Sequence, residues 1–484
     1  MESLKEKAAR GFFWGAMNSG VTQLLNLVIG VFLLRLLTPD DYGIVGVLSV
    51  FTLIAGNLQA CGFTQGLANL KRPTANDYNS VFWFNVIVSI IMYAVLFACA
   101  PLIAGFFHQP KLVTLSRFTF LAFLISSLGI TRNAYMHKNL MNRERAVIGM
   151  VALLVSGVCG ITLACCGMAY WSLAWQQVIY ITVANMGRHY YTRHLWNPSF
   201  HFDFKPVRGM FRFSSKLLLT SILNTLGSNV LTFIFGRYLP IRAVGNFTQA
   251  NKWNTMGYTL ITGMIEQVAQ PVLVEVTGDE DREKRVFRKM IRFAAFLSFP
   301  ALFGLSMVAE EFTLLLGSAK WIDSVPLLQL LCLSGAFAPF YTMFQQLVVS
   351  NGRSDIYLGC SFMQIVLQVL VIMAFISRGV LVMTAVFCLF YILYLSVWYF
   401  MSRHLIRLRL HELLLDICPF CMVSLVIMSA VWFTTRGIDL LLARLVVRII
   451  LAALLYILTM KLARVEILDE CIRFVTKKKT KTAG

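Results

Sequence analysis

Charged residues are scarce in this sequence. Only 14% of its 484 residues are charged whereas 58% are hydrophobic, and the mean hydropathy is +0.71. Such values lie outside the usual composition of soluble globular proteins. Acidic residues are fewer than basic ones, with 23 Asp and Glu against 43 Lys and Arg, which gives a formal net charge of +20. No polar stretch is long enough for a soluble domain, so basic loops at a membrane explain this charge better than nucleic acid.

Several motifs of enzymes and metal proteins are also missing. The sequence has no G-x-x-x-x-G-K-[ST] motif, which excludes ATP hydrolysis through a P-loop. Its 11 cysteines show no spacing typical of a disulfide framework, and the CxxC pair Cys418 and Cys421 has no partner pair. His189, His194 and His201 lie in a basic stretch without Cys or paired carboxylates, which argues against zinc. We therefore expect neither a metal nor a cofactor.

Long hydrophobic runs dominate what is present. Runs of about 17 to 25 apolar residues, enough to cross a bilayer as helices, recur along the chain and predict an all-α polytopic membrane protein of about fourteen spans. The first run, residues 11–37, exceeds a signal-peptide core and is predicted to be a retained span. The boundary between the fifth and sixth predicted spans, at residues 166–168, has only a weak loop signal, which leaves twelve or thirteen spans as alternatives. The predicted spans begin near Gly11, Gly43, Val81, Leu115, Val147, Ala169, Phe213, Val244, Phe293, Val325, Ile356, Val380, Leu413 and Leu440.

The distribution of basic residues supports this count. With the N-terminus inside, about 31 of the 43 Lys and Arg fall in alternate loops, as the positive-inside rule requires. If one span were misplaced, the basic residues would no longer gather on one side of the membrane. The sequence therefore predicts an even number of spans and cytoplasmic N- and C-termini.

An internal repeat predicts two lobes. The polar link at residues 195–212 separates an N-terminal lobe, residues 1–194, from a C-terminal lobe, residues 213–402, and residues 403–484 add two spans and a basic tail. A shift of 202 residues aligns Arg35, Leu37, Gly43 and Gln65 with Arg237, Leu239, Gly245 and Gln267. The same shift relates the polar stripe Asn18, Thr22 and Asn26 to Thr220, Asn224 and Ser228. Parallel repeats of this kind predict a central cavity between two six-helix lobes.

The eighth predicted span carries a second polar stripe. Its polar residues are spaced by three or four and so share one helix face: Lys252, Thr255, Thr259, Thr262, Glu266 and Gln270. A charge at bilayer depth costs about 2.5 to 3.5 kcal/mol and is a functional candidate by default. The alternative is that Lys252 extends to the outer interface and Glu266 to the inner one as anchors.

Other charged groups have similar alternatives. Lys216 faces either a cavity or the inner interface, and Arg35 and Arg237 either bind an anion or cap helix C-termini. Cations suit phosphate, whereas amides and hydroxyls suit a sugar. Glu266 either couples transport to a proton or sodium gradient or forms a salt bridge with a neighbouring lysine. The predicted substrate-cavity residues are Lys252, Lys216, Asn224, Thr220, Asn18, Thr22, Asn26, Thr259, Arg35 and Arg237.

The segment LLTPDDYG at residues 36–43, which follows a basic N-terminus and an apolar span, resembles bacterial polysaccharide flippases of the Wzx type. These belong to the multidrug/oligosaccharidyl-lipid/polysaccharide exporter superfamily, and the colanic-acid-exporter branch is the most similar. The resemblance extends to about Arg409. Further matching segments are FGRYL at residues 235–239, SFPA at 298–301, LGSAKW at 316–321 and SNGR at 350–353.

This resemblance implies a transporter and not an enzyme. It implies alternating access that moves a polyprenyl-pyrophosphate-linked oligosaccharide across a bacterial inner membrane for lipopolysaccharide, capsule or exopolysaccharide synthesis, with a polysaccharide polymerase as a further partner. A multidrug-type exporter of the same superfamily is one alternative. An integral-membrane glycosyltransferase or polymerase is another, but it needs a large extramembrane loop with clustered Asp, Glu or His. The outer loops here are too short.

Overall fold

The computed structural model describes residues 4–60, 67, 73–139, 141–194, 198–199, 204–465 and 467–468. Within them, only the backbone is described for residues 4–19, 58–60, 204–220, 267–268, 270–271 and 354. This part of the chain is helical and contains no strand. It divides into two compact units, Met1–Gly245 and Asn246–Gly484, which are treated separately below.

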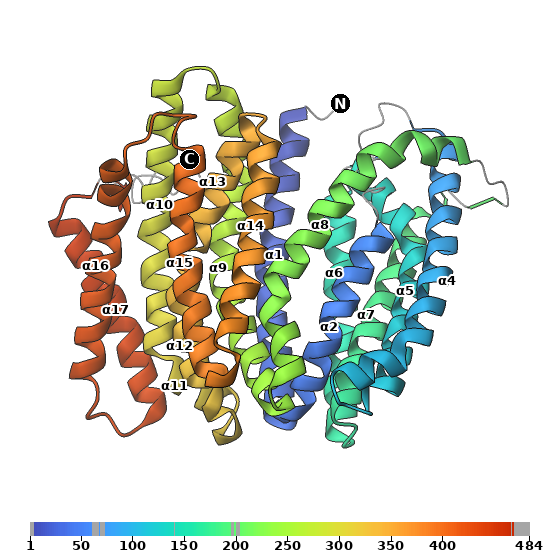
Figure 1. Ribbon diagram of the computed structural model, residues 1–484, viewed down its shortest axis with the longest axis horizontal. Helices are drawn as coiled ribbons and strands as arrows, with labels where there is room; N and C mark the ends of the chain where they lie inside the picture. The colour runs from blue at the N-terminus through green and yellow to red at the C-terminus, as the bar shows by residue number, and fades with distance from the viewer. Residues whose placement is uncertain are drawn as a thin grey trace, which may run out of the picture. The chain divides into compact units, whose positions relative to one another are not determined.

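The first unit is a bundle of long helices (Figure 1). Helix α4 packs on α5, both α5 and α6 pack on α7, α1 packs on α6, and α2 packs on α8. The helices are α1 Leu4–Leu36, α2 Pro39–Ala60, α4 Ala75–Phe106, α5 Leu112–Lys138, α6 Asn142–Cys165, α7 Tyr170–Thr192 and α8 Phe204–Tyr238.

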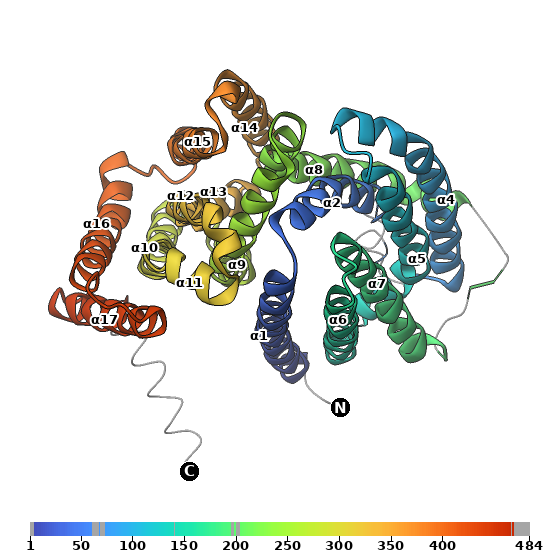
Figure 2. The same ribbon diagram turned by 90° about the horizontal axis from the view of Figure 1, so that it is seen from below.

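The second unit is built around α10 (Figure 2). This helix packs against α12 and α16, while α15 packs against α12 and α14, and α17 packs against α16 and α11. Its helices are α9 Ile241–Val276, α10 Glu280–Met307, α11 Ala309–Leu316, α12 Val325–Gly335, α13 Ala338–Ser350, α14 Ser354–Ala374, α15 Val380–Ser402, α16 Leu410–Thr434 and α17 Leu441–Leu462, with 3₁₀ turns at Ala319–Ser324 and Ile376–Arg378.

The prediction of an all-α polytopic membrane protein is confirmed. In the described part of the chain, nine helices are long and apolar enough to cross a membrane. Helices α1, α2, α7, α8 and α9 account for the other predicted spans, and every predicted start lies within a helix or directly before one. The predicted span beginning at Val325 is divided between α12 and α13, because Pro339 lies in the first turn of α13 and cannot donate a backbone hydrogen bond.

The weakly marked join after the fifth predicted span is a tight turn. Helix α6 ends at Cys165 and α7 begins at Tyr170, with Gly167 between them at a φ of +80°. Glycine adopts this conformation without the steric cost that a Cβ would add. The turn therefore favours the larger of the predicted span counts.

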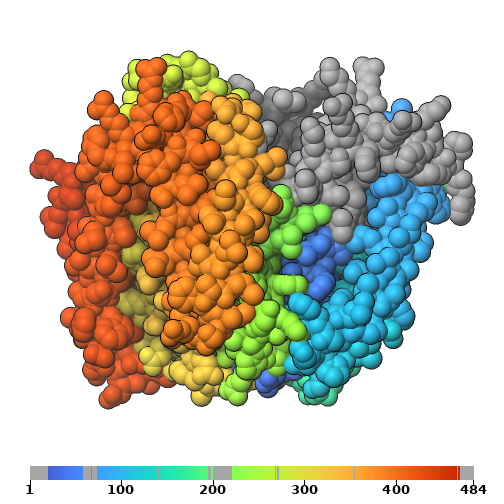
Figure 3. Space-filling model, viewed as in Figure 1, coloured from blue at the N-terminus to red at the C-terminus, as the bar shows by residue number. Residues whose placement is uncertain are grey.

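Large apolar side chains cover the outside of the helices. Figure 3 shows that α14 and α15 form much of one visible face of the second unit. Phe362 and Leu370 on α14 are 59% and 60% exposed, and Leu389 and Leu393 on α15 are 57% and 61% exposed. A contiguous apolar surface of this kind is unfavourable in water but is what a helix requires where it faces lipid.

The link at residues 195–212 is partly helical. Helix α8 begins at Phe204, with Pro206 in its first turn, where the missing N–H has no partner to lose. Helix α8 also packs on α2 and α4 within the first unit, whose boundary lies after Gly245. The division into lobes at residues 1–194 and 213–402 remains a prediction.

The first turns of α2 and α9 touch through glycines. A Cβ on Gly43 would overlap the carbonyl oxygen of Ile241, and a Cβ on Gly245 would overlap that of Pro39. All four residues lie in the first unit. The shift of 202 residues that relates Gly43 to Gly245 also relates Pro39 to Ile241, so the contact is symmetric with respect to the proposed repeat.

Candidate functional site

The polar stripe of α9 forms one face of that helix in the second unit. Lys252 and Thr255 are half-buried, Thr262 is buried, and Thr259 and Glu266 are exposed. A regular helix over Ile241–Val276 explains this arrangement, because residues three and four apart lie above one another. The stripe therefore presents a cation, three hydroxyls and a carboxylate in order along the helix.

The threonine hydroxyls bond to their own helix. Thr259 Oγ1 donates to the carbonyl oxygen of Thr255, and Thr262 Oγ1 lies 3.3 Å from the carbonyl oxygens of both Tyr258 and Thr259. A hydroxyl that donates in this way keeps its acceptor lone pairs. The hydroxyl oxygens of Thr259 and Thr262 thus remain available as acceptors for a ligand.

Lys252 and Glu266 have no charged partner among the residues that the structure describes. About 21 Å of helix separates them, so they do not pair with each other. Neither side chain makes an ion pair or hydrogen bond to another described residue. The alternative of a salt bridge between Glu266 and a nearby lysine therefore finds no support in the described chain. Unpaired charges at membrane depth must face water or a ligand.

Three buried amides accompany Lys252 on the first turns of α9. Gln249 is 1%, Asn246 3% and Asn254 4% exposed. Both amide atoms of Gln249 and the Oδ1 atoms of the two asparagines have no hydrogen-bond partner among the residues that the structure describes. Asn254 fits against Gly335 of α12, where a Cβ would collide with it. Because a buried polar group without a partner costs about 1 to 3 kcal/mol, these amides mark a place for water or a ligand. Sequence analysis missed them, although the spacing of Asn246 and Gln249 was a usable signal.

In the first unit, the predicted cavity residues are only partly described. Thr22 and Asn26 on α1 are half-buried, whereas Asn224 on α8 and Arg35 at the end of α1 are exposed. Both α1 and α8 are continuous helices, so the predicted i, i+4 spacing on each is present in the backbone. The side chains of Asn18, Lys216 and Thr220 lie outside the described residues.

Arg237 contacts the end of a neighbouring helix. Its Nη1 donates to the carbonyl oxygen of Phe106, the last residue of α4, over 2.6 Å, and contacts His108 Nδ1 at 2.7 Å. The guanidinium carbon also lies 4.9 Å from the centroid of the Phe106 ring. A cation at this place complements the partial negative charge at a helix C-terminus. Anion binding and helix capping were the two roles considered for Arg237. The structure shows contacts of the capping kind, made with the C-terminus of α4 and not with that of α8, which carries Arg237.

A polar contact that the sequence did not reveal joins α2 to α8. Asn57 Nδ2 donates to Thr225 Oγ1 over 2.6 Å, and Asn229 Nδ2 donates to the Thr225 carbonyl oxygen over 2.9 Å. Asn57 and Thr225 lie 168 positions apart, so spacing along the sequence gives no sign of the contact. Part of the polar surface of α8 therefore serves packing within the first unit.

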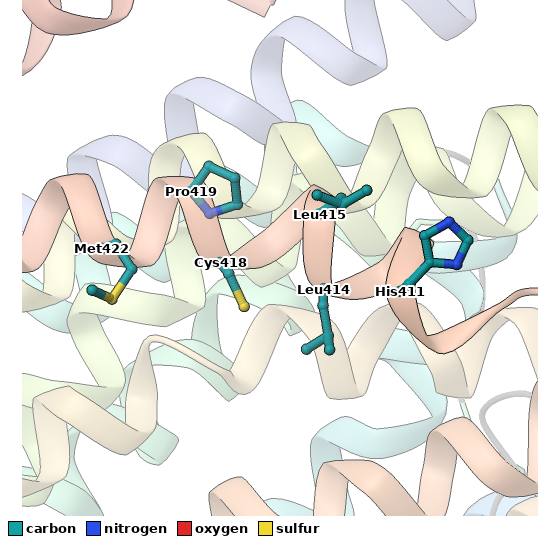
Figure 4. A pocket seen from close by; sticks show the side chains of 6 residues that line it. All are labelled: His411, Leu414, Leu415, Cys418, Pro419 and Met422. Carbon is teal, nitrogen blue, oxygen red and sulfur yellow. The ribbon is translucent and has the colours of Figure 1, made fainter.

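Cys418 of the CxxC pair lines an apolar pocket of about 360 Å³ on α16 (Figure 4). Its six lining residues are His411, Leu414, Leu415, Cys418, Pro419 and Met422. Cys418 and Cys421 are free thiols. Over the described residues, no group of three His, Cys, Asp or Glu side chains is placed to hold a metal ion.

Comparison with solved structures defines the fold. A structure of the lipid II flippase MurJ in an inward closed conformation matches 93% of this chain and 99% of its own length, with a TM-score of 0.74 at 12% identity. An inward-facing multidrug resistance MATE family transporter of the MOP superfamily matches 86% of this chain and 96% of its own length, with a TM-score of 0.60 at 17% identity. The fold is that of the polytopic α-helical MOP transporters.

Sequence comparison then gives the family. The model of the polysaccharide biosynthesis protein family matches residues 32–326, and the chain belongs to this family. Lipopolysaccharide biosynthesis protein WzxC of Escherichia coli K12 is 26% identical over 358 residues, which is 73% of this chain and 72% of WzxC. Teichuronic acid biosynthesis protein TuaB of Bacillus subtilis is 23% identical over 359 residues, 74% of each chain. The resemblance to Wzx-type proteins is thereby confirmed.

Proposed function

We propose that this protein is a flippase that moves a polyprenyl-pyrophosphate-linked oligosaccharide from the cytoplasmic to the outer leaflet by alternating access. Membership of the polysaccharide biosynthesis family and the fold shared with a lipid II flippase support this proposal. The single observation that carries the site is Lys252, a half-buried cation without an acidic partner in the described chain, on a helix face that also carries three hydroxyls and one distant carboxylate.

The chemistry of this face suits such a substrate. Pyrophosphate is a compact anion that a lysine ammonium binds as a point charge. A sugar loses water on every hydroxyl when it enters the protein, and acceptor oxygens and amides replace that water. Thr255, Thr259 and Thr262 supply acceptors, and Gln249 and Asn246 supply amides on the turns nearest Lys252.

Glu266 is our candidate for coupling to an ion gradient. It is exposed on the same face as Lys252 and makes no ion pair in the described chain. A carboxylate in that position binds either a proton or a sodium ion, and its charge changes as it does so. Since the sequence has no P-loop, a gradient and not bound ATP would supply the free energy of transport.

The proposed location is the bacterial inner membrane, with both termini cytoplasmic, because the basic residues gather in alternate loops. The translocated unit would pass to a polysaccharide polymerase for lipopolysaccharide, capsule or exopolysaccharide synthesis. The fold is also similar to that of a MATE transporter, so export of small organic molecules is the alternative to lipid-linked oligosaccharide transport.

Deletion of the gene and complementation test the proposal. We expect the deletion strain to lose a surface polysaccharide and to accumulate its lipid-linked unit in the cytoplasmic leaflet. Wild type should restore export, whereas Lys252→Ala and Lys216→Ala at matched membrane levels should reduce it about tenfold or more, the cost of a hydrogen bond to a charged group. Lys252→Arg, which keeps the charge, should retain more activity than Lys252→Ala.

Lys289→Ala is the matched control, because it removes an exposed lysine from α10. Full rescue by both test variants would contradict pyrophosphate binding by these lysines and return them to the role of interfacial anchors. An intact surface polysaccharide in the deletion strain would instead favour small-molecule export.

A further inference from the structure

A pocket of about 320 Å³ lies between three helices of the second unit. Its walls come from α12 and α16 and from α10, which packs against both of them (Figure 2). Seven of its ten lining residues are large and apolar, and the other three are Ser306, Gln329 and Ser429. A mostly apolar pocket with a few polar groups is typical of a binding site for a small amphipathic molecule.

The mouth of this pocket opens on a surface that suits lipid. Leu425 and Phe433 on α16 line the pocket and are 44% and 65% exposed. Helices α10, α12 and α16 all belong to segments that are long and apolar enough to cross a membrane. Within a bilayer, lipid chains cover an apolar surface of this kind. A lipid acyl chain is therefore the molecule that the apolar part of the pocket can take.

Two of the polar lining groups are free to bind a ligand. Ser306 Oγ donates to the backbone carbonyl oxygen of Gln329 over 3.2 Å, which joins α10 to α12. The side-chain amide of Gln329 and the hydroxyl of Ser429 make no hydrogen bond to a described residue. A serine in a helix commonly donates to a carbonyl three or four residues earlier, as Ser396 does over 2.7 Å. The pocket thus presents donors to an acceptor on a bound molecule.

A cation lies at the edge of the pocket. The guanidinium carbon of Arg436, just beyond the end of α16, lies 4.2 Å from the centroid of the Trp432 ring and 5.9 Å from that of Phe433. Both rings line the pocket. Trp432 is three residues beyond Ser429, about 4.5 Å along the helix, so the cation is at one end and Ser429 lies deeper. By the predicted topology this is the outer end of α16, where arginine and tryptophan meet the membrane interface.

The charge of Arg436 is not offset within the described chain. Arg436 is exposed and forms neither an ion pair nor a hydrogen bond with a described residue. Asp439, three positions further on, is also exposed and forms no ion pair there. The arginines of α17 differ, because Arg444 and Arg448 share Glu311. Arg436 therefore neither caps a helix nor joins two helices by an ion pair, and its guanidinium can bind an anion from outside the chain.

We propose that this pocket binds an outer-leaflet phospholipid with a net negative headgroup, of the phosphatidylglycerol type. The acyl chain occupies the apolar part, and the ester carbonyl oxygens accept hydrogen bonds from Ser429 and Gln329. The phosphate binds Arg436, whose guanidinium matches two phosphate oxygens. A glycerophospholipid carries its ester groups between phosphate and chain, which is the order of these groups along α16. The site lies apart from Lys252 and does not depend on which molecule is transported.

Lipid binding to the purified full-length protein tests the site. Native mass spectrometry would compare phosphatidylglycerol, phosphatidylethanolamine and undecaprenyl phosphate, which has no ester carbonyl. We expect wild type to bind phosphatidylglycerol about fivefold or more tightly than phosphatidylethanolamine, and Arg436→Gln to lose that advantage. Arg378→Gln is the matched control, because Arg378 is an exposed arginine at another predicted outer turn and does not line the pocket. It should change binding less than twofold.

A second variant tests the pocket and not the charge. Ser429→Phe places a ring at the exposed rim of the pocket and removes the hydroxyl, so it should weaken phosphatidylglycerol binding about fivefold. Ala430→Phe adds the same ring one residue further on, at an exposed position that does not line the pocket. It should bind phosphatidylglycerol as wild type does.

Three results would overturn the proposal. The first is equal binding of phosphatidylglycerol by wild type, Arg436→Gln and Ser429→Phe. The second is equal binding of phosphatidylglycerol and phosphatidylethanolamine by wild type, which would show that the net charge of the headgroup is not recognised. The third is weaker binding of undecaprenyl phosphate alone in the variants, which would assign the pocket to a polyprenyl lipid.

Thermal unfolding separates lost binding from misfolding. Arg436 touches only aromatic rings in the described chain, so Arg436→Gln without added lipid should unfold at the same temperature as Arg378→Gln. Added phosphatidylglycerol should raise the unfolding temperature of Arg378→Gln more than that of Arg436→Gln, since a ligand stabilises the folded state that binds it. An equal rise would contradict the site. Lys252→Ala should keep phosphatidylglycerol binding, so failure of the transport site and failure of this pocket give different results.

Discussion

The Glu311→Gln variant should be less stable than wild type by about 3 to 5 kcal/mol, the usual cost of removing one partner of a buried ion pair. Glu311 on α11 is fully buried. Its Oε1 lies 2.7 Å from Arg448 Nη1 and 2.7 Å from Arg444 Nε on α17. Arg448 is 2% exposed and also donates to Thr435 Oγ1 over 2.9 Å. The glutamine would leave two arginines at this site with no carboxylate.

Glu310→Gln is the matched control for this variant. It makes the same chemical change one residue earlier on α11, where the side chain is exposed. We expect Glu310→Gln to unfold within about 0.5 kcal/mol of wild type, as surface substitutions usually do. The measurement is thermal unfolding of purified protein in detergent, together with the amount of folded protein in the membrane. Equal unfolding temperatures for the two variants would show that Glu311 does not hold α17 in place.

A second ionic cluster joins the N-terminal part of α16 to α10. Arg288 on α10 pairs with Asp416 at 2.6 Å, and Lys284 pairs with Glu412 at 2.7 Å. The Tyr456 hydroxyl on α17 donates to the Phe296 carbonyl oxygen over 2.9 Å. The last two helices are thus joined to α10 and α11 by polar contacts at both ends. These contacts fix α16 and α17 to the rest of the second unit.

The parts of the fold that the sequence predicts are those that depend on residues close together in the chain. Runs of apolar residues and the alternation of basic loops located every span, because both signals depend only on how one segment meets lipid and water. The spacing of Lys252, Thr259 and Glu266 placed them on one helix face for the same reason. Helix ends were less predictable: α8 begins within the polar link, since polarity alone does not distinguish a loop from the exposed first turns of a helix.

The contacts between distant segments were not predictable from one sequence. Glu311 and Arg448 lie 137 residues apart, and Arg237 reaches a carbonyl 131 residues away. The sequence placed Arg237 at the outer end of a span, and its analysis did not single out Arg448 or Glu311. The contact of Arg132 with His189, 57 residues away, is likewise a property of helix packing that spacing along the sequence does not reveal.

Gly245→Val should lower stability by about 3 kcal/mol or more, because overpacking here meets backbone and not a side chain that can turn away. A Cβ at Gly245 would overlap the Pro39 carbonyl oxygen and stand 3.0 Å from the backbone nitrogen of Gly43. The first turns of α2 and α9 would have to separate to admit it. Thermal unfolding and complementation of the deletion strain measure the effect, and we expect transport to fall with stability.

Gly263→Val is the control for this substitution, since Gly263 lies on the same helix and a Cβ there meets nothing within 4 Å. Both changes introduce the same β-branched residue into α9, so the difference between them isolates the contact with α2. The double variant Gly43→Ala/Gly245→Ala should cost less than the sum of its single variants, because one separation of the two helix ends relieves both overlaps. Strict additivity, or equal unfolding of Gly245→Val and Gly263→Val, would contradict a shared contact. Less than additive loss would instead identify the two glycines, at equivalent positions of the repeat, as one close crossing of α2 and α9.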